Sequence, residues 1–177
     1  KHPNISGLQF SESIKFTADL KEALYDARII IIAIPSQTVR NLISQIQPLV
    51  SGEVIIVNLS KGIENSSLMT MSQVIHDEGD FNPQNIVSLY GPSHAEEVAL
   101  GMPTTLVAAG PSDDHTALIQ QVFSSENLRV YTNSDILGVE LGGSVKNVIA
   151  IAAGIIDGIG FGDNTKAALI TRGITEI

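Results

Sequence analysis

Three short runs of almost uninterrupted aliphatic residues constrain the fold of this chain more than any other feature. They cover residues 28–34 (RIIIIAI), 53–59 (EVIIVNL) and 86–90 (IVSLY). Strands without a polar face are buried on both faces, which is typical of a parallel sheet covered by helices on each side. Residues 104–109 and 128–132 predict two further short strands.

Helical patterns separate these strands. Residues 36–49 carry apolar side chains at the i, i+3, i+4 spacing of an amphipathic helix. Polar residues that can cap a helix precede this segment and four others: Asp19, Ser36, Asn65 or Ser67, Ser93 and Ser112. We also expect residues 20–27 to be helical and residues 14–17 to form an edge strand. The alternation of strands and helices predicts an α/β fold with a doubly wound parallel sheet.

The pattern changes beyond the last predicted strand. Asp135 can cap a long helix over residues 136–156 that is apolar nearly all round, and residues 164–177 look helical again. A helix without a polar face is expected to be the core helix of an all-α unit. We therefore predict a domain boundary near residues 131–135, followed by the start of an all-α C-terminal domain.

The composition limits the classes of function. There are 10 Lys and Arg residues against 19 Asp and Glu residues, a net charge of −9, so we expect no nucleic-acid partner. The absence of cysteine excludes disulfide scaffolds and thiolate zinc sites, and the four histidines lack metal-ligand spacing. No apolar run approaches the ~18 residues of a membrane helix, and no signal peptide is visible. We expect no metal, no membrane insertion and a cytoplasmic location.

Small or cationic residues follow three of the predicted strands: Pro35-Ser36, Ser60-Lys61-Gly62 and Gly91-Pro92-Ser93. Ligands of open α/β sheets bind outside the carboxyl ends of the strands, which is where these residues are expected. Pro35 and Ser36 are more simply a loop residue and a helix cap, while for Gly91 and Ser93 both interpretations stay open. Lys61 is a lone cation after a buried strand in an acidic protein, which favours binding of a phosphate or carboxylate.

Lys146 is the strongest candidate for catalysis. An ammonium group in an almost wholly apolar helix is expected to hold its proton weakly, which suits proton transfer near neutral pH. The alternative is a structural ion pair with Asp157 or Glu140. Glu140 and Asn147 lie on another face of the helix, where we expect packing hydrogen bonds. The small residues that share the face of Lys146, and would leave room for a ligand, are Gly142, Gly143, Ala150 and Ala153.

Several of these motifs occur together in a recognisable order. They are Ser60-Lys61-Gly62, Gly91-Pro92-Ser93-His94-Ala95 and Val145-Lys146-Asn147-Val148, with the stretches GVELGGSVKNVIAI (138–151), DGIGFGDN (157–164) and ALITRG (168–173). In this order the chain resembles the bacterial type of NAD(P)-dependent glycerol-3-phosphate dehydrogenase over essentially its whole length.

The resemblance implies reversible reduction of dihydroxyacetone phosphate to sn-glycerol 3-phosphate with NAD or NADP as the cofactor, feeding glycerophospholipid synthesis. It implies that Lys146 is the general acid and base. It also implies that Lys61, Gly91 and Ser93, together with Lys146, bind the substrate, and that Lys61 and Ala95 contact the cofactor. We therefore expect the ammonium groups of Lys61 and Lys146 to face one cleft that holds a small phosphate substrate.

The resemblance further implies a partial NAD(P)-binding Rossmann-like domain at residues 1–133 and the start of an α-helical substrate domain at residues 134–177. The family's first strand and Gly-rich phosphate loop are not in this sequence, nor are further substrate residues that include an Asp and an Arg-Asn pair. We expect a fragment lacking both ends that is inactive alone, from a whole protein that is an enzyme. Its apolar C-terminal helices favour a homodimer or aggregate.

Two alternatives stay open. One is a related two-domain dehydrogenase that acts on another hydroxy acid or a sugar acid, which a substrate panel would distinguish. The other is a non-catalytic binding module that keeps the sheet without the cofactor loop. An upstream sequence that encodes strand, G-x-G-x-x-G and helix in phase with this chain would argue against the binding module.

Overall fold

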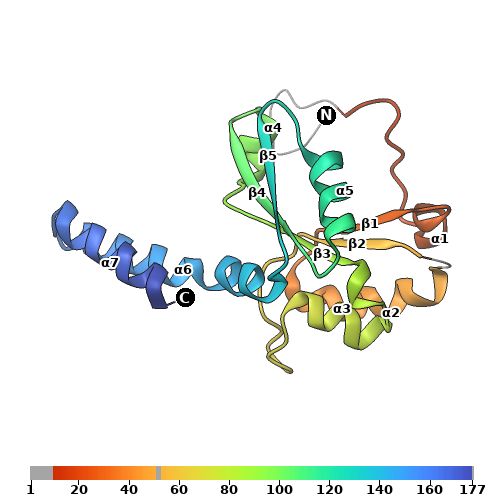
Figure 1. Ribbon diagram of the computed structural model, residues 1–177, viewed down its shortest axis with the longest axis horizontal. Helices are drawn as coiled ribbons and strands as arrows, with labels where there is room; N and C mark the ends of the chain where they lie inside the picture. The colour runs from red at the N-terminus through yellow and green to blue at the C-terminus, as the bar shows by residue number, and fades with distance from the viewer. Residues whose placement is uncertain (1–9, 51–52, 177) are drawn as a thin grey trace.

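The computed structural model describes residues 10–50 and 53–176 of the chain. The parts of the two predicted domains at residues 1–9, 51–52 and 177 lie outside the described residues. Figure 1 shows a twisted central sheet with helices on both sides, and its five strands follow the order of the sequence. The predicted α/β fold is confirmed. The strands are β1 (Ile29–Ile32), β2 (Ile55–Asn58), β3 (Ile86–Tyr90), β4 (Thr104–Ala109) and β5 (Leu128–Asn133).

The sheet is mixed, so the expectation of an all-parallel sheet is wrong at one position. β1, β2 and β3 are parallel neighbours and β4 is parallel to β5, but β4 runs antiparallel to β3, with Leu89 opposite Ala108. A parallel partner requires a long crossover over one face of the sheet. The link from β3 to β4 contains only the five-residue helix α4 (Ala95–Ala99) and returns to the sheet at the same end, so β4 runs back.

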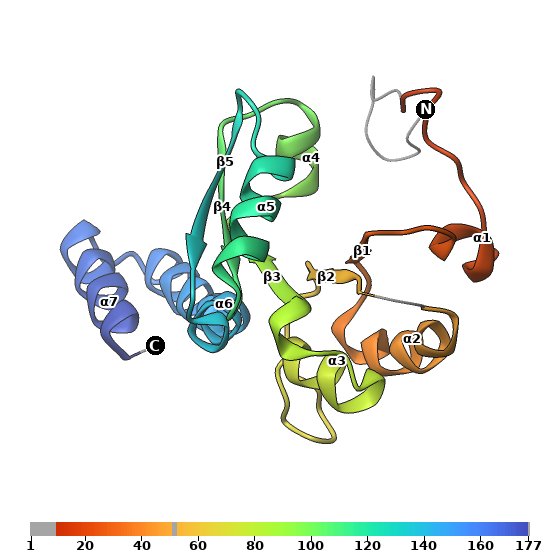
Figure 2. The same ribbon diagram turned by 45° about the vertical axis from the view of Figure 1, so that its right-hand side comes forward.

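Helices cover the sheet in two separate cores. Successive side chains of a strand point to opposite faces, so Ile56 of β2 faces one core and Val57 faces the other. α2 (Val39–Ile46) and α3 (Met71–Gly79) lie side by side over the first core, and α5 (Asp113–Phe123) covers the second, as Figures 1 and 2 show. The remaining elements are α1 (Leu20–Leu24), α6 (Ile136–Gly158), α7 (Asp163–Glu176), η1 (Ser36–Thr38), η2 (Gln47–Leu49) and η3 (Pro83–Asn85).

β1 is covered fully on one face and only at Ile29 on the other. Ile30 and Ile32 are buried in the first core, but Ile31, which points to the other face, is 50% exposed. The prediction that this strand is buried on both faces is therefore wrong within the described chain. β1 lies at the edge of the sheet, and α5 packs over β3, β4 and β5 instead.

The predicted helix caps are correct where the side chain reaches a free backbone N–H. Asp19 accepts from the N–H of Lys21 at the start of α1, and Ser112 accepts from the N–H of His115 in α5. α1 ends at Leu24 rather than at residue 27, and Asp26 follows in the left-handed conformation with φ 55°.

Three other predicted helix starts are wrong. α3 begins after Thr70, whose N–H donates to Gln73 in a reciprocal capping box, and not after Asn65 or Ser67. Ser36 is itself the first residue of η1, which precedes α2, and its side chain caps neither element. Ser93 also does not cap α4, because its hydroxyl donates to the carbonyl of Gly91.

The edge strand expected at residues 14–17 is not formed. The backbone N–H of Ile14 donates to the carbonyl of Ser11, and Ile14 and Phe16 are exposed. An extended segment needs a neighbouring strand for its hydrogen bonds, and no strand in the described part of the chain lies beside this one. The segment therefore stays irregular as it leads to α1.

α6 and α7 form an antiparallel pair that extends away from the sheet (Figure 1). The predicted cap is confirmed, because Asp135 accepts from the N–H of Gly138. The prediction of a core helix is wrong for the described residues, since Val148, Ile151 and Ile155 are all exposed. By length and composition α6 could cross a membrane, although its uninterrupted apolar runs are short. The absence of membrane insertion stays a prediction.

Candidate active site

Lys61 and Lys146 line the same pocket, although 85 positions separate them in the sequence. Lys61 follows the carboxyl end of β2, and Lys146 lies midway along α6. The carboxyl ends of β2 and β3 adjoin because these strands are parallel, and α6 packs against β3. The pocket has a volume of about 420 Å³ and is lined by Lys61, Pro92, Ser93, His94, Gly143, Ser144, Lys146 and Asn147.

Lys61 is fixed in position by the neighbouring strand. Its Nζ donates a hydrogen bond to the carbonyl of Gly91 over 2.6 Å and lies 6.0 Å from the centre of the Tyr90 ring. Burial, and then repulsion by the charge on Lys146, lower the pKa of Lys61 below its usual range. Two cations that disfavour each other in one pocket favour an anion between them.

Lys146 itself is exposed, so the expectation that apolar side chains surround its ammonium group is wrong. α6 packs against β3 with the side that carries the buried Glu140, and Lys146 lines the pocket with an exposed side chain. Asp157, one of its two suggested structural partners, binds Lys166 of α7 over 2.6 Å instead. Of the small residues predicted to leave room beside Lys146, Gly143 lines the pocket, but the ring of Tyr90 occupies the place of its missing side chain.

The remaining predicted site residues lie close to this pocket. Ser93 lines it, whereas Gly91 adjoins it through its bond with Lys61. A side chain at Gly91 would collide with the backbone of Thr105 in β4, so packing alone requires glycine there. Ala95 is the exposed first residue of α4, directly after the lining residue His94.

The pocket has three lining residues that were not predicted as site residues, His94, Ser144 and Asn147. Asn147 was expected to pack, but it is exposed at the pocket beside Lys146. Its position in sequence directly after Lys146 was the available signal. His94 could have been found from its place in the loop after β3, at the ligand-binding edge of the sheet.

A buried polar cluster lies beneath the pocket. Glu140 is 0% exposed and accepts hydrogen bonds from side chains or backbone of Asn58, Ser72 and Ser88. The Tyr90 hydroxyl donates to the carbonyl of Ser60, and burial followed by the charge of Glu140 raises the pKa of Tyr90 above its usual range. The predicted packing hydrogen bond of Glu140 is confirmed, but the complete burial of its carboxylate was not predicted. A polar residue inside each of two aliphatic strands was the signal for this cluster.

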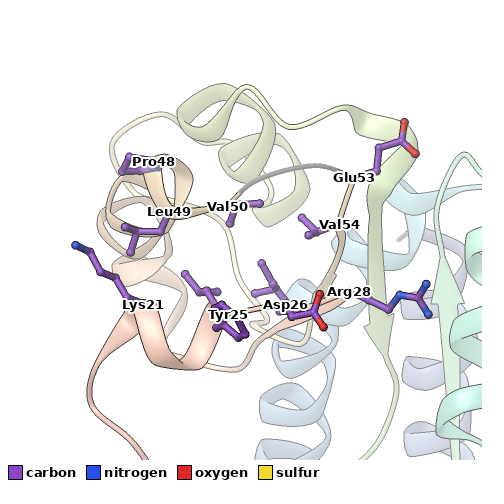
Figure 3. A pocket seen from close by; sticks show the side chains of 12 residues that line it. Lys21, Tyr25, Asp26, Arg28, Pro48, Leu49, Val50, Glu53 and Val54 are labelled. Carbon is purple, nitrogen blue, oxygen red and sulfur yellow. The ribbon is translucent and has the colours of Figure 1, made fainter.

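Another hollow, of about 620 Å³, lies at the amino ends of β1 and β2 (Figure 3). It sits between α1 and η2, and Arg28 and Glu53, just before β1 and β2, line it. Ligands of open α/β sheets bind at the carboxyl ends of the strands, whereas this hollow is at the amino ends. The pocket with the two lysines is therefore the better candidate for an active site.

Comparisons with known proteins identify the family of this chain. Residues 2–116 match the family model for the N-terminus of NAD-dependent glycerol-3-phosphate dehydrogenase, and residues 135–177 match the model for its C-terminus. The chain is 52% identical over 174 residues to glycerol-3-phosphate dehydrogenase (NAD(P)+) 2 of Salinibacter ruber, covering 98% of this chain and 51% of the relative. It is 49% identical over 176 residues to glycerol-3-phosphate dehydrogenase (NAD(P)+) of Bacillus subtilis, covering 99% and 50%.

A solved structure agrees as well. The crystal structure of glycerol-3-phosphate dehydrogenase from Coxiella burnetii superposes with a TM-score of 0.86 at 37% identity, covering 97% of this chain and 52% of that one. The chain thus spans about half the length of these relatives. The match of both family models, in order and around the two-lysine pocket, shows that this chain belongs to the family of NAD-dependent glycerol-3-phosphate dehydrogenases.

Proposed function

We propose that the whole protein containing this chain interconverts dihydroxyacetone phosphate and sn-glycerol 3-phosphate with NAD(P)H. The observation that carries the proposal is the shared pocket of Lys61 and Lys146 in a chain of this family. The chain has a net charge of −9, so an anionic substrate meets an unfavourable overall field. Two cations at one pocket give that substrate a local binding site.

Lys61 is proposed to bind the substrate. Its ammonium group is oriented by the carbonyl of Gly91, and the charge of Lys146 makes it harder to keep protonated. A phosphate ester in the pocket would remove this repulsion, because both cations would then have a negative partner. Ser93 lines the same pocket and could turn its hydroxyl from Gly91 to a substrate oxygen.

Lys146 is proposed to move the proton. In the reducing direction its ammonium group donates a proton to the carbonyl oxygen of the substrate as hydride reaches the carbon atom. In the oxidising direction its neutral amine accepts the hydroxyl proton of sn-glycerol 3-phosphate. Proton and hydride together account for the two hydrogen atoms that convert the ketone to the alcohol.

A nicotinamide cofactor, when bound, supplies the hydride of this reaction. The described residues are compatible with part of such a cofactor. The loops after β1 and β2 approach each other closely at the carboxyl ends of the strands, where ligands of such sheets bind. Gly62 has φ 145°, and a Cβ atom there would lie 2.6 Å from the hydroxyl of Ser36. Lys61 and the backbone of Ala95 would contact the cofactor beside this edge. A Gly-rich loop for the pyrophosphate does not follow any strand of the described chain.

We infer a cytoplasmic location for the whole protein. The lack of cysteine agrees with a reducing compartment, and the proposed substrate and cofactor are small soluble metabolites. We infer in addition that the exposed apolar side chains of α6 and α7 are covered by protein, for which a homodimer is one arrangement.

The test is turnover by the purified whole protein. We expect oxidation of NADH or NADPH that depends on dihydroxyacetone phosphate and is much weaker with keto acids or with oxidised sugar acids that carry a keto group. Lys146→Ala should lower kcat by about 10²–10⁴-fold, the range for loss of a general acid. Lys166→Ala, which removes an exposed lysine of α7 bound to Asp157, is the matched control and should stay active.

Two results would overturn the proposal. Preferential turnover of another hydroxy acid would assign the pocket to a different dehydrogenase. Turnover by Lys146→Ala close to that of the Lys166→Ala control would remove Lys146 from the role of proton donor.

A further inference from the structure

The helix that carries Lys146 has one buried side chain where it contacts the sheet, and this side chain is a carboxylate. Among the residues of α6, Glu140 alone is buried, and it is 0% exposed. Large apolar side chains of the same helix, such as Val148 and Ile151, point into the surroundings instead. Apolar contact of α6 with the sheet is limited to half-buried side chains such as Ile136, which packs against the first core. The hydrogen bonds of Glu140 therefore contribute strongly to the orientation of α6.

Both carboxylate oxygens of Glu140 have donors from three other elements. Oε1 accepts from the Ser72 N–H over 2.9 Å, the Ser88 hydroxyl over 2.7 Å and the Asn58 amide over 3.2 Å. Oε2 accepts from the Ser72 hydroxyl over 2.6 Å. Ser72 lies in the first turn of α3, where backbone N–H groups and the helix dipole favour a negative charge. A buried carboxylate is thus satisfied without a cation.

The same cluster leads directly to Lys61. Asn58, which donates to Glu140, also accepts from the N–H of Ser60, the residue before Lys61. Asn58 donates to the Tyr90 hydroxyl over 3.0 Å, and the ring of Tyr90 lies beneath Nζ of Lys61. A Cβ atom on Gly143 of α6 would lie 2.6 Å from that ring, so the helix rests on it.

We propose that Glu140 is a positioning residue that sets Lys146 against Lys61 across the pocket. Lys146 lies six residues further along α6, about 9 Å along the helix axis, so a small tilt at Glu140 displaces its ammonium group. Displacement of a reacting group by ~1 Å can cost about 10²-fold in rate. This inference rests on the proposed function, because it takes Lys146 as the proton donor.

The test is Glu140→Gln in the whole protein, which keeps the shape of the side chain but removes its charge and one acceptor oxygen. We expect kcat to fall about 10- to 100-fold while KM changes less. Lys61, the proposed substrate-binding residue, keeps its hydrogen bond to the carbonyl of Gly91, which does not involve Glu140. Asp157→Asn is the matched control, since it removes an exposed carboxylate from the same helix. That control should keep kcat.

A double mutant separates positioning from mere support of the fold. Combined with Lys146→Ala, Glu140→Gln should cost almost nothing further in kcat, because the proton donor that it positions is already gone. An equally large further loss would overturn the proposal, since Glu140 would then act on something other than Lys146. If Glu140→Gln does not fold, Ser88→Ala removes one donor and leaves the other three contacts, and it should show the same kcat loss in weaker form.

Failure of this inference is distinguishable from failure of the proposed function. An unmodified whole protein without activity on dihydroxyacetone phosphate would contradict the proposed function. An active protein in which both Glu140→Gln and Ser88→Ala keep the wild-type kcat would contradict the positioning role alone.

Discussion

The sheet and the α6–α7 pair are built on different principles. In the sheet, Ile56 and Val57 fill two cores on opposite faces, and both are fully buried. In the α6–α7 pair, the buried residues of the described chain are a carboxylate, Glu140, and a glycine, Gly173, whose missing side chain makes room for Ile149. Apolar packing thus stabilises the sheet, whereas buried hydrogen bonds and close backbone approach hold the helix that carries Lys146.

The largest expected difference between the two regions is in stability. Ile56→Ala removes a 0% exposed side chain and should lower the free energy of unfolding by about 2–5 kcal/mol. Ile151→Ala removes the same atoms from a side chain of α6 that is 65% exposed. It should change the free energy of unfolding by less than about 0.5 kcal/mol. Urea unfolding of this chain measures both. Equal losses would show that α6 is packed as tightly as the sheet.

Two glycines of α6 differ in how closely they approach the sheet. Gly143→Ala places a Cβ atom 2.6 Å from the ring of Tyr90, which cannot easily move because its hydroxyl is bound to Ser60. Overpacking costs about 1–3 kcal/mol, and the higher helix propensity of alanine returns at most about 1 kcal/mol. We therefore expect a net loss of stability.

Gly154→Ala is the matched substitution, because apart from its chain neighbours and the adjacent helix backbone nothing lies within 4 Å of its added Cβ. The helix propensity of alanine should then raise the free energy of unfolding by about 0.5–1 kcal/mol. Opposite signs for the two variants are the expected result of urea unfolding. The same sign for both would mean that the contact of α6 with Tyr90 contributes nothing to stability.

The same division explains how far the sequence predicts the structure. The aliphatic strands and the Asp135 cap are local signals, so the sheet and α6 were found with ends within a few residues. The antiparallel β4 was missed, because strand direction depends on where the α4 loop returns and not on the composition of the strand. The exposure of Val148 and Ile151 was not predicted for a related reason. An apolar pattern shows which side chains favour burial, but it does not show whether another element covers them.

The candidate site was predictable where single residues were unusual for their surroundings. Lys61 after an aliphatic strand and Lys146 in an apolar helix were both visible, and the structure places them in one pocket. The cluster of Asn58, Ser88 and Glu140 was not predicted, because its members come from three elements and a polar residue in an aliphatic strand does not show which other element it contacts. The roles of Lys61, Gly91, Ser93, Ala95 and Lys146 stay predictions that the proposed experiments test.

The smallest expected effect concerns titration at the junction of the two regions. Lys61 of the sheet edge has a lowered pKa, and the charge of Lys146 on α6 is one of its causes after burial. Lys146→Met removes this repulsion and should move the titration midpoint of the Lys61 amine upward, though not to its ordinary value because the burial remains. NMR of the lysine side chains in this chain measures the midpoint, and Lys166→Met is the matched control that should leave it unchanged.

The lowered pKa of Lys61 should also make the stability of the chain depend on pH. The pKa of Lys61 is lower in the folded chain, so between that lowered value and 10.5 the unfolded chain binds more protons. The contribution of Lys61 to the free energy of unfolding should therefore rise with pH through this window and be lost as the pH falls through the lowered pKa. Lys146→Met narrows the window and should reduce the rise. A midpoint and a pH dependence that are both the same as in the unmodified chain would show that α6 does not hold its lysine near the sheet edge in solution.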